Sequence, residues 1–183
     1  MKQMTQQNLI NAFGGESQAH MRYLHFANKA EKEGYKNVSR LFRAIAHAEF
    51  IHAGDHYHEL RHLEGGFTAN SMAAFGPGDT AKNLRLSIMG ETFEINEMYP
   101  AYMKVAEFQE EAGARRSFEW SWGTEKQHKL LFEKAEQSVN ESRDVDLGPV
   151  QVCEICGYTV EGDAPDICPL CRARREKFTA FST

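Results

Sequence analysis

Apolar residues recur at three- and four-residue spacing along four long stretches of the chain, which is the period of one face of an α-helix. The four expected helices cover about residues 5–33, 36–64, 80–112 and 114–142. The first two and the last two are joined by short connections, and a longer crossover separates the pairs. This arrangement predicts a mainly α protein built on a four-helix bundle of the ferritin-like type.

The crossover and the third stretch carry the clearest breaks in this pattern. Phe75-Gly76-Pro77-Gly78-Asp79 is turn chemistry, so residues 65–79 are expected to form a loop or a short crossing segment. Asp79 or Thr80 can cap the third helix. Pro100 lies inside that helix and removes a backbone hydrogen bond, so we expect a kink near Asn96.

Charged residues interrupt the apolar stripes at matched positions of the four helices. In Glu49–His52 and Glu125–His128 a carboxylate and an imidazole lie three residues apart, on one helix face. A buried carboxylate costs several kcal/mol unless it is paired or binds metal. One Glu from each of two helices and a Glu-x-x-His from each of the others is the di-iron or di-manganese design. The candidate ligands are Glu16, Glu49, His52, Glu91, Glu94, Glu125 and His128.

The alternative for any helical glutamate is a solvated position on the surface, which suits most glutamates of this chain. Ligand types alone do not choose between iron and manganese. Glu91 and Glu94 lie three residues apart, so both can face the site and together they exceed the four-Glu minimum. The extra carboxylate gives one iron a choice of ligand when its charge changes, because ferric iron favours carboxylate.

Four cysteines follow the helices, in two Cys-x-x-Cys motifs that use every cysteine of the chain. Cys153 with Cys156 and Cys168 with Cys171 predict one tetrahedral thiolate site for iron or zinc. We expect a bundle domain at 1–142, a linker at 143–150 and a metal-binding domain at 151–183. The last has too few residues for an apolar core and needs its metal.

Composition limits the kinds of binding partner and the cellular compartment that we expect for this protein. The net charge of -5 gives no basic footprint for nucleic acid. No apolar run approaches the roughly 20 residues of a membrane helix, and the N-terminus lacks a signal-peptide core. We therefore expect a soluble, cytoplasmic protein without nucleic-acid or membrane partners. In a reducing cytosol, Cys-x-x-Cys pairs are more often metal ligands than disulfides.

The cysteine motifs resemble rubredoxin, through Gly157-Tyr158 after the first pair and Pro169 inside the second. Two features depart from it: a short spacer between the pairs, and Arg172 where a glycine usually follows the fourth cysteine. Bundle and cysteine motifs together resemble the rubrerythrins over essentially the whole chain. The motifs are Gly15-Glu16-Ser17-Gln18-Ala19, Glu49 to His52, Gly90-Glu91 through Glu94 to Met98-Tyr99-Pro100, Glu125 to His128, and the cysteine pairs.

The resemblance implies roles for these residues. Glu49 and Glu125 would bridge two irons, Glu91 and His128 would hold one, and Glu16 the other. Glu94 would bind the second iron when it is oxidised and His52 when it is reduced, which makes both catalytic candidates. Tyr23 and Tyr99 match tyrosines beside the family's site, and a third iron, or zinc in recombinant protein, would occupy the cysteines.

The implied activity is a non-haem peroxidase that reduces hydrogen peroxide to water and protects against oxidative stress. Electrons would come from an NAD(P)H-dependent rubredoxin-type reductase, or from rubredoxin, and pass through the Fe(Cys)4 centre. The implied assembly is a homodimer, in which one subunit's cysteine module can approach the other's bundle. Two other readings stay open: iron oxidation and storage in a ferritin-like cage, and a structural protein with a zinc ribbon.

Overall fold

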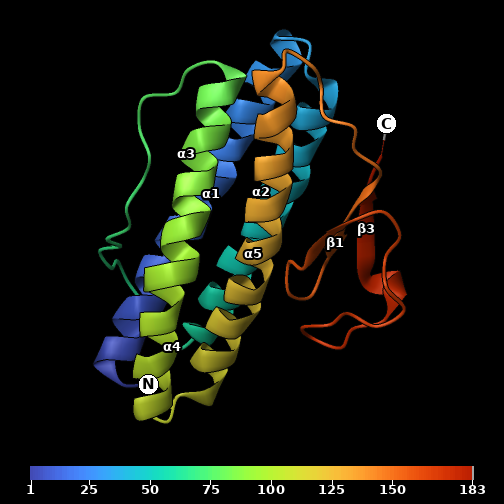
Figure 1. Ribbon diagram of the computed structural model, residues 1–183. Coiled ribbons are helices and arrows are strands. Elements are labelled where there is room, and N and C mark those ends of the chain that lie inside the picture. Colours follow the sequence, from blue (N-terminus) through green and yellow to red (C-terminus); the bar gives the residue numbers. More distant parts are fainter. Residues whose placement is uncertain (183) are drawn as a thin grey trace.

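The chain folds into a bundle of four long helical segments with a small β module on one side (Figure 1). The computed structural model describes residues 1–182, so Thr183, the last residue of the expected C-terminal domain, lies outside them. The predicted four-helix bundle and the small C-terminal β region are both present. The helices are α1 (Gln3–Lys32), α2 (Lys36–Glu59), α3 (Thr80–Phe93), the π-helix η1 (Glu94–Met98), α4 (Tyr99–Phe108) and α5 (Ala112–Asn140).

The two helices of the first pair, α1 and α2, end in different ways. Gly34 adopts φ 88°, a left-handed conformation that stops α1 and lets the chain reverse into α2. The predicted end of the second helix at residue 64 was wrong, because α2 ends at Glu59. The backbone turns there, which lets Leu60 and Leu63 pack against the apolar cluster at that end of the bundle.

The third segment contains a π-helical turn between α3 and α4. Asp79 caps α3 as predicted, by accepting a hydrogen bond of 2.8 Å from the backbone N–H of Lys82. The irregularity expected near Asn96 takes the form of η1, because Pro100 in the first turn of α4 has no N–H for the α-helical ladder. This segment ends at Phe108, four residues earlier than predicted, and Glu110 turns the chain at φ 61°.

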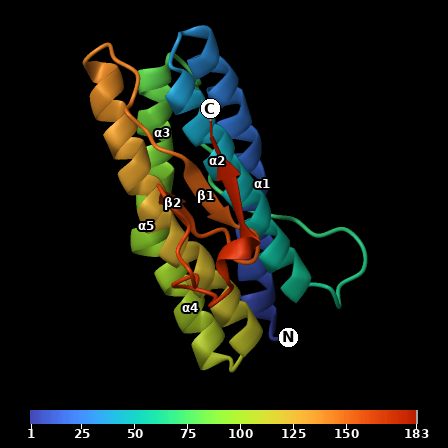
Figure 2. The ribbon, with the colours of Figure 1, turned by 90° about the vertical axis from the view of Figure 1, so that its right-hand side faces the viewer.

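The β module is an antiparallel sheet of order β2-β1-β3 that lies against α2 and α5 (Figure 2). Its strands are β1 (Val150–Cys153), β2 (Thr159–Glu161) and β3 (Phe178–Phe181), with a 3-10 turn η2 (Arg175–Lys177) before β3. Val150 and Val152 are fully buried and belong to the main core of the bundle. The module and the bundle therefore share one hydrophobic core.

The segment between α5 and β1 is fastened to the start of α2. The Asp144 carboxylate accepts from the backbone N–H groups of Asn37 (2.8 Å) and Val38 (3.2 Å), which would otherwise lack partners at the helix N-terminus. Arg40 donates to the carbonyls of Leu147, Gly148 and Phe181. We keep the division at 1–142, 143–150 and 151–183 as a proposal, in which the linker holds the module in place.

Within residues 1–182 no helix combines the length and the apolar character that a membrane span requires.

Candidate metal centres

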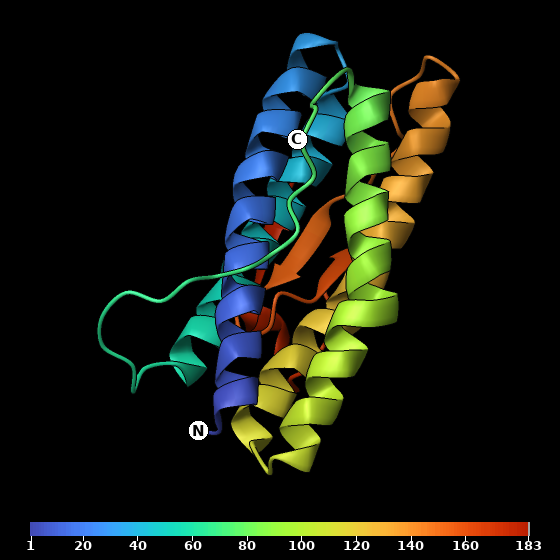
Figure 3. The same cartoon turned by 90° about the vertical axis from the view of Figure 1, so that its left-hand side faces the viewer.

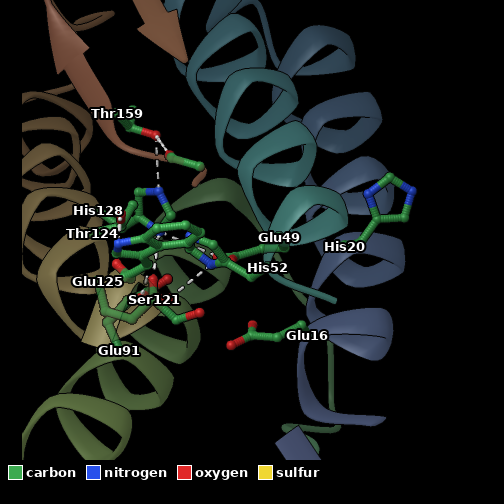
Figure 4. Close-up of polar contacts among 12 residues, drawn as sticks. Glu16, His20, Glu49, His52, Glu91, Ser121, Thr124, Glu125, His128 and Thr159 are labelled. Atoms are coloured by element: carbon green, nitrogen blue, oxygen red, sulfur yellow. Dashed lines mark hydrogen bonds and ion pairs between the residues drawn. The ribbon is translucent and has the colours of Figure 1, made fainter. Parts of the chain in front are cut away.

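Two overlapping groups of buried ligands lie at the centre of the bundle (Figure 4). One consists of Glu16, Glu49, His52 and Glu125, and the other of Glu49, Glu91, Glu125 and His128. In each group the ligand atoms lie within 4.8 Å of one another. Glu49 and Glu125 belong to both groups, so they would lie between two bound ions.

The two shared carboxylates each turn one oxygen to each histidine. Glu49 Oε2 lies 2.9 Å from His52 Nδ1, and Glu49 Oε1 lies 3.2 Å from His128 Nδ1. Glu125 Oε1 lies 3.0 Å from His52 Nδ1, and Glu125 Oε2 lies 2.7 Å from His128 Nδ1. This near-symmetric arrangement is what two bridging carboxylates require.

The electrostatics of the site fit bound cations. Burial, reinforced by facing carboxylates, raises the pKa of Glu16 and Glu91 well above the usual value. Burial opposes the charge of His128, but Glu49 and Glu125 outweigh it and raise its pKa to about 9. Several buried ligand atoms form no hydrogen bond within the described residues, although some lie close to a facing ligand: Glu16 Oε2, His52 Nε2, Glu91 Oε2, both Glu125 oxygens and His128 Nδ1. Two multivalent cations would neutralise the carboxylates and bind these ligand atoms, and the donor set suits iron.

Glu94 lies outside both ligand groups. It is half-buried, begins the π-helix η1 and lines a cavity between α1 and α3. His52 instead lies inside the first group and faces the β module. The two residues expected to alternate as ligands therefore approach the site from different sides.

Both predicted tyrosines contact site carboxylates, each from a different end of the bundle. The Tyr23 hydroxyl donates to Glu91 Oε1 at 2.7 Å, and the Tyr99 hydroxyl donates to Glu16 Oε1. Tyr23 belongs to the core cluster at one end, and Tyr99 to the cluster at the other. The hydroxyls orient the two terminal carboxylates.

His56 supports Tyr99 from behind, which the sequence alone did not reveal. Its Nε2 lies 3.1 Å from the Tyr99 hydroxyl and its Nδ1 lies 2.7 Å from Ser117 Oγ. Burial lowers the pKa of His56 to about 3, so the ring is neutral and donates through only one nitrogen. His20 instead bonds through Nδ1 to the Ala46 carbonyl and points away from the site (Figure 4).

The β module contacts both histidines of the bundle site. Thr159 Oγ1 donates to the Gly157 carbonyl (2.9 Å), so it accepts from His128 Nε2 (3.1 Å). That hydrogen bond leaves His128 Nδ1 free to bind metal, the usual role of an outer partner to a ligand histidine. Gly157 lies against His52 so closely that a Cβ there would meet the ring at 2.6 Å from Cδ2. Sequence reasoning missed Thr159, because no motif links it to a helix 31 residues away.

The four cysteines form a second cluster within the module. The Sγ atoms of Cys153 and Cys171 lie 3.6 Å apart, as do those of Cys156 and Cys168. A disulfide would bring each pair to about 2.05 Å, so the thiols are free. All four sulfurs lie within 4.8 Å of one another, which suits one tetrahedral ion with bonds of about 2.3 Å.

Two matching turns carry the cysteine pairs. Gly157 (φ 74°) and Arg172 (φ 67°) each follow the second cysteine of a pair in a left-handed conformation. Their N–H groups donate to the carbonyls of Cys153 (2.9 Å) and Cys168 (3.1 Å). Arg172 therefore keeps the backbone that a glycine would adopt, at a strain of about 1–2 kcal/mol.

Comparisons with known proteins match both parts of the chain. The Rubrerythrin family model matches residues 7–136, and the model of the rubrerythrin rubredoxin-like domain matches residues 151–179. Rubrerythrin-2 of Clostridium acetobutylicum is 41% identical over 178 residues, covering 97% of this chain and 97% of its own. Nigerythrin of Nitratidesulfovibrio vulgaris is 33% identical, covering 97% of this chain and 86% of its own. A structure of fully reduced, all-ferrous nigerythrin superposes with a TM-score of 0.85 at 32% identity, covering 97% of this chain and 86% of that one.

Proposed function

Because the chain belongs to the rubrerythrin family, with a di-iron bundle site and an iron-binding rubredoxin-like domain, we propose that it reduces hydrogen peroxide to water. The reaction consumes one peroxide, two electrons and two protons and yields two waters. The electrons enter from an NAD(P)H-dependent rubredoxin-type reductase, or from rubredoxin, and pass through the cysteine centre to the bundle. The family membership shows an oxidoreductase; the substrate and the donor are the proposal.

The observation that carries this proposal is the direct contact between the two metal-binding parts. Gly157 follows Cys156 in the chain and lies against His52, and Thr159 reaches His128. Iron held by the cysteines would therefore be joined to the histidines of the bundle site through direct protein contacts. This contact forms within one chain, so the relay needs no second subunit, although we retain the homodimer as the proposed assembly.

The side chains at the bundle site have different roles. Iron bound there would supply the two electrons and polarise the peroxide. Glu49 and Glu125 would hold both ions in our proposal, and Glu91 with His128 would hold one of them. Glu16 would hold the other ion, with His52 or Glu94 as its alternating ligand. The hydroxyls of Tyr23 and Tyr99 keep Glu91 and Glu16 oriented throughout.

The test uses iron-loaded protein that is reduced without oxygen and then mixed with hydrogen peroxide. We expect peroxide consumption with return of the ferric-thiolate absorption, faster than with dioxygen. Cys156→Ser should block steady-state turnover but leave a single peroxide reaction at the bundle. Full turnover in that variant would refute the relay, and an absence of thiolate bands in the wild type would favour a zinc-stabilised structural role.

A second test separates transfer within a chain from transfer between chains. Cys156→Ser and Glu125→Ala disable the two centres separately, so mixed dimers contain one intact centre of each kind on different chains. The intrachain contact predicts that mixing restores no turnover. Recovered turnover would show that the module of one subunit serves the bundle of the other.

A further inference from the structure

The crossover between the helix pairs forms a strap along α1. We call residues 65–79 the strap; Figure 3 shows it leaving the end of α2, crossing α1 and rising between α1 and α3. Asn11 accepts from the backbone of Asn70 at 2.9 Å, and Gln7 donates to the Thr68 carbonyl at 3.1 Å. These contacts hold the strap against the helix that carries Glu16.

A glycine inside α1 permits this close crossing. A Cβ at Gly14 would lie 2.8 Å from the Ala69 Cβ, whereas one at Gly15 would make an ordinary contact at 3.7 Å from the Ser71 Cβ. A glycine costs about 0.5–1 kcal/mol in a helix interior relative to alanine. Gly14, two residues before Glu16, therefore has a packing reason, which is the passage of the strap.

A cavity of about 240 Å³ lies beneath the strap and reaches Glu94, beside the metal site. Its walls include Gly15 of α1, Ala73 of the strap, and Glu94 and Met98 of the π-helix. An adjoining cavity of about 420 Å³, almost wholly apolar, shares Ala73 with it and contains the exposed strap residue Phe75.

Two buried polar groups line both cavities. Gln18 Oε1 and Arg22 Nε have no hydrogen-bond partner within the described residues. A buried polar atom without a partner is costly unless a ligand or water satisfies it. Hydrogen peroxide has two O–H donors and two acceptor oxygens, so it can accept from Arg22 and donate to Gln18.

We propose that this cavity is the entrance through which hydrogen peroxide reaches the bundle site, and that the strap sets its size limit. Gln18 and Arg22 bind the peroxide on its way to Glu94, and bulky alkyl hydroperoxides enter more slowly than hydrogen peroxide. The inference rests on the proposed peroxidase function. It also gives the molecule two functional faces, because the cysteine module covers α2 and α5 while the strap lies over α1 and α3 (Figures 2 and 3).

Met98 provides a probe of entry that does not depend on turnover. It is a half-buried wall residue, and peroxides convert methionine to its sulfoxide. Full-length protein loaded with zinc, which has no redox chemistry, is treated with hydrogen peroxide or tert-butyl hydroperoxide, and sulfoxides are measured by mass spectrometry. Relative to the exposed Met4, Met98 should be oxidised severalfold more slowly by the bulky reagent than by hydrogen peroxide.

A matched pair of strap variants localises the entrance. Ala73→Phe places a ring in the cavity and should slow both Met98 oxidation and peroxide turnover of the iron-loaded protein severalfold. Gly66→Phe adds a ring to the same strap where a Cβ meets nothing within 4 Å, and should leave both unchanged. Equal rates of Met98 oxidation in the two variants would overturn the proposal that this cavity is the entrance.

Gly14→Ala tests the strap in the opposite direction. The new methyl pushes Ala69 away while it raises the helix propensity of α1, so the helix itself is not weakened. We expect faster Met98 oxidation by tert-butyl hydroperoxide, and an unchanged rate would count against the strap as a size limit. The iron-loaded wild type could fail to reduce peroxide while Met98 is still oxidised more slowly by the bulky reagent. In that case the proposed function is refuted, but the cavity remains the entrance for small peroxides.

Discussion

Gly157→Ala should detach the cysteine module from the bundle site. The added Cβ would lie 2.6 Å from His52 Cδ2 and 3.2 Å from the Ala48 carbonyl oxygen, so the module must move outward. Movement also breaks the hydrogen bond between Thr159 and His128. Glycine is required here for the close approach and for φ 74° together.

The size of the effect follows from these contacts. Left-handed alanine costs about 1–2 kcal/mol of backbone strain wherever it occurs. Overpacking adds about 1–3 kcal/mol and the lost hydrogen bond about 0.5–1.5 kcal/mol. The overpacking and the lost hydrogen bond both weaken the contact between the module and the bundle. The equilibrium for docking of the module should therefore weaken by at least about tenfold.

Gly162→Ala is the matched control for strain. Gly162 lies in the same module at φ 92°, and a Cβ there meets nothing within 4 Å. It therefore carries the backbone penalty of Gly157→Ala without the overlap with His52.

The assay follows the ferric-thiolate absorption after reduced, iron-loaded protein is mixed with one equivalent of hydrogen peroxide. We expect reoxidation of the cysteine centre to be slowed strongly in Gly157→Ala and to remain close to the wild-type rate in Gly162→Ala. Equal rates in the two variants would refute the idea that contact between Gly157 and His52 positions the relay.

Two further predictions concern positions outside the ligand set. Thr159→Val should weaken Mn²⁺ binding in the bundle by about 10- to 100-fold, because His128 loses the partner that orients it, while Thr159→Ser retains affinity; equal losses in calorimetric titration would indicate a packing role instead. Glu33 is partly buried, but hydrogen bonds from Lys29 and Thr80 outweigh burial and lower its pKa. The contribution of Glu33 to the free energy of unfolding is therefore present above the unfolded pKa of about 4.3. It is lost as the pH falls through the lower pKa of the folded state. Glu33→Gln should cost about 1 kcal/mol in urea unfolding at pH 7, with the difference shrinking at acid pH, and a pH-independent loss would contradict this.

The sequence by itself determined the features that depend on local spacing. A three-residue separation puts Glu49 with His52, and Glu125 with His128, on one helix face whatever the rest of the chain does. Apolar periodicity identified the helices, and Asp79 marked the start of α3 correctly. Helix ends were less accurate: α2 ends before residue 64, because packing of Leu60 and Leu63 decides where the backbone turns.

Only the tertiary structure decided which distant residues meet. Thr159 reaches His128, and His56 supports Tyr99, through contacts between elements that no local pattern connects. In the sequence Gly14 is a glycine inside a helical stretch, whereas the fold shows that the strap crosses α1 there. Periodicity specifies which face of a helix is buried, but not which neighbour lies against it. That choice depends on the path of the crossover and on the docking of the module, both set by long-range packing.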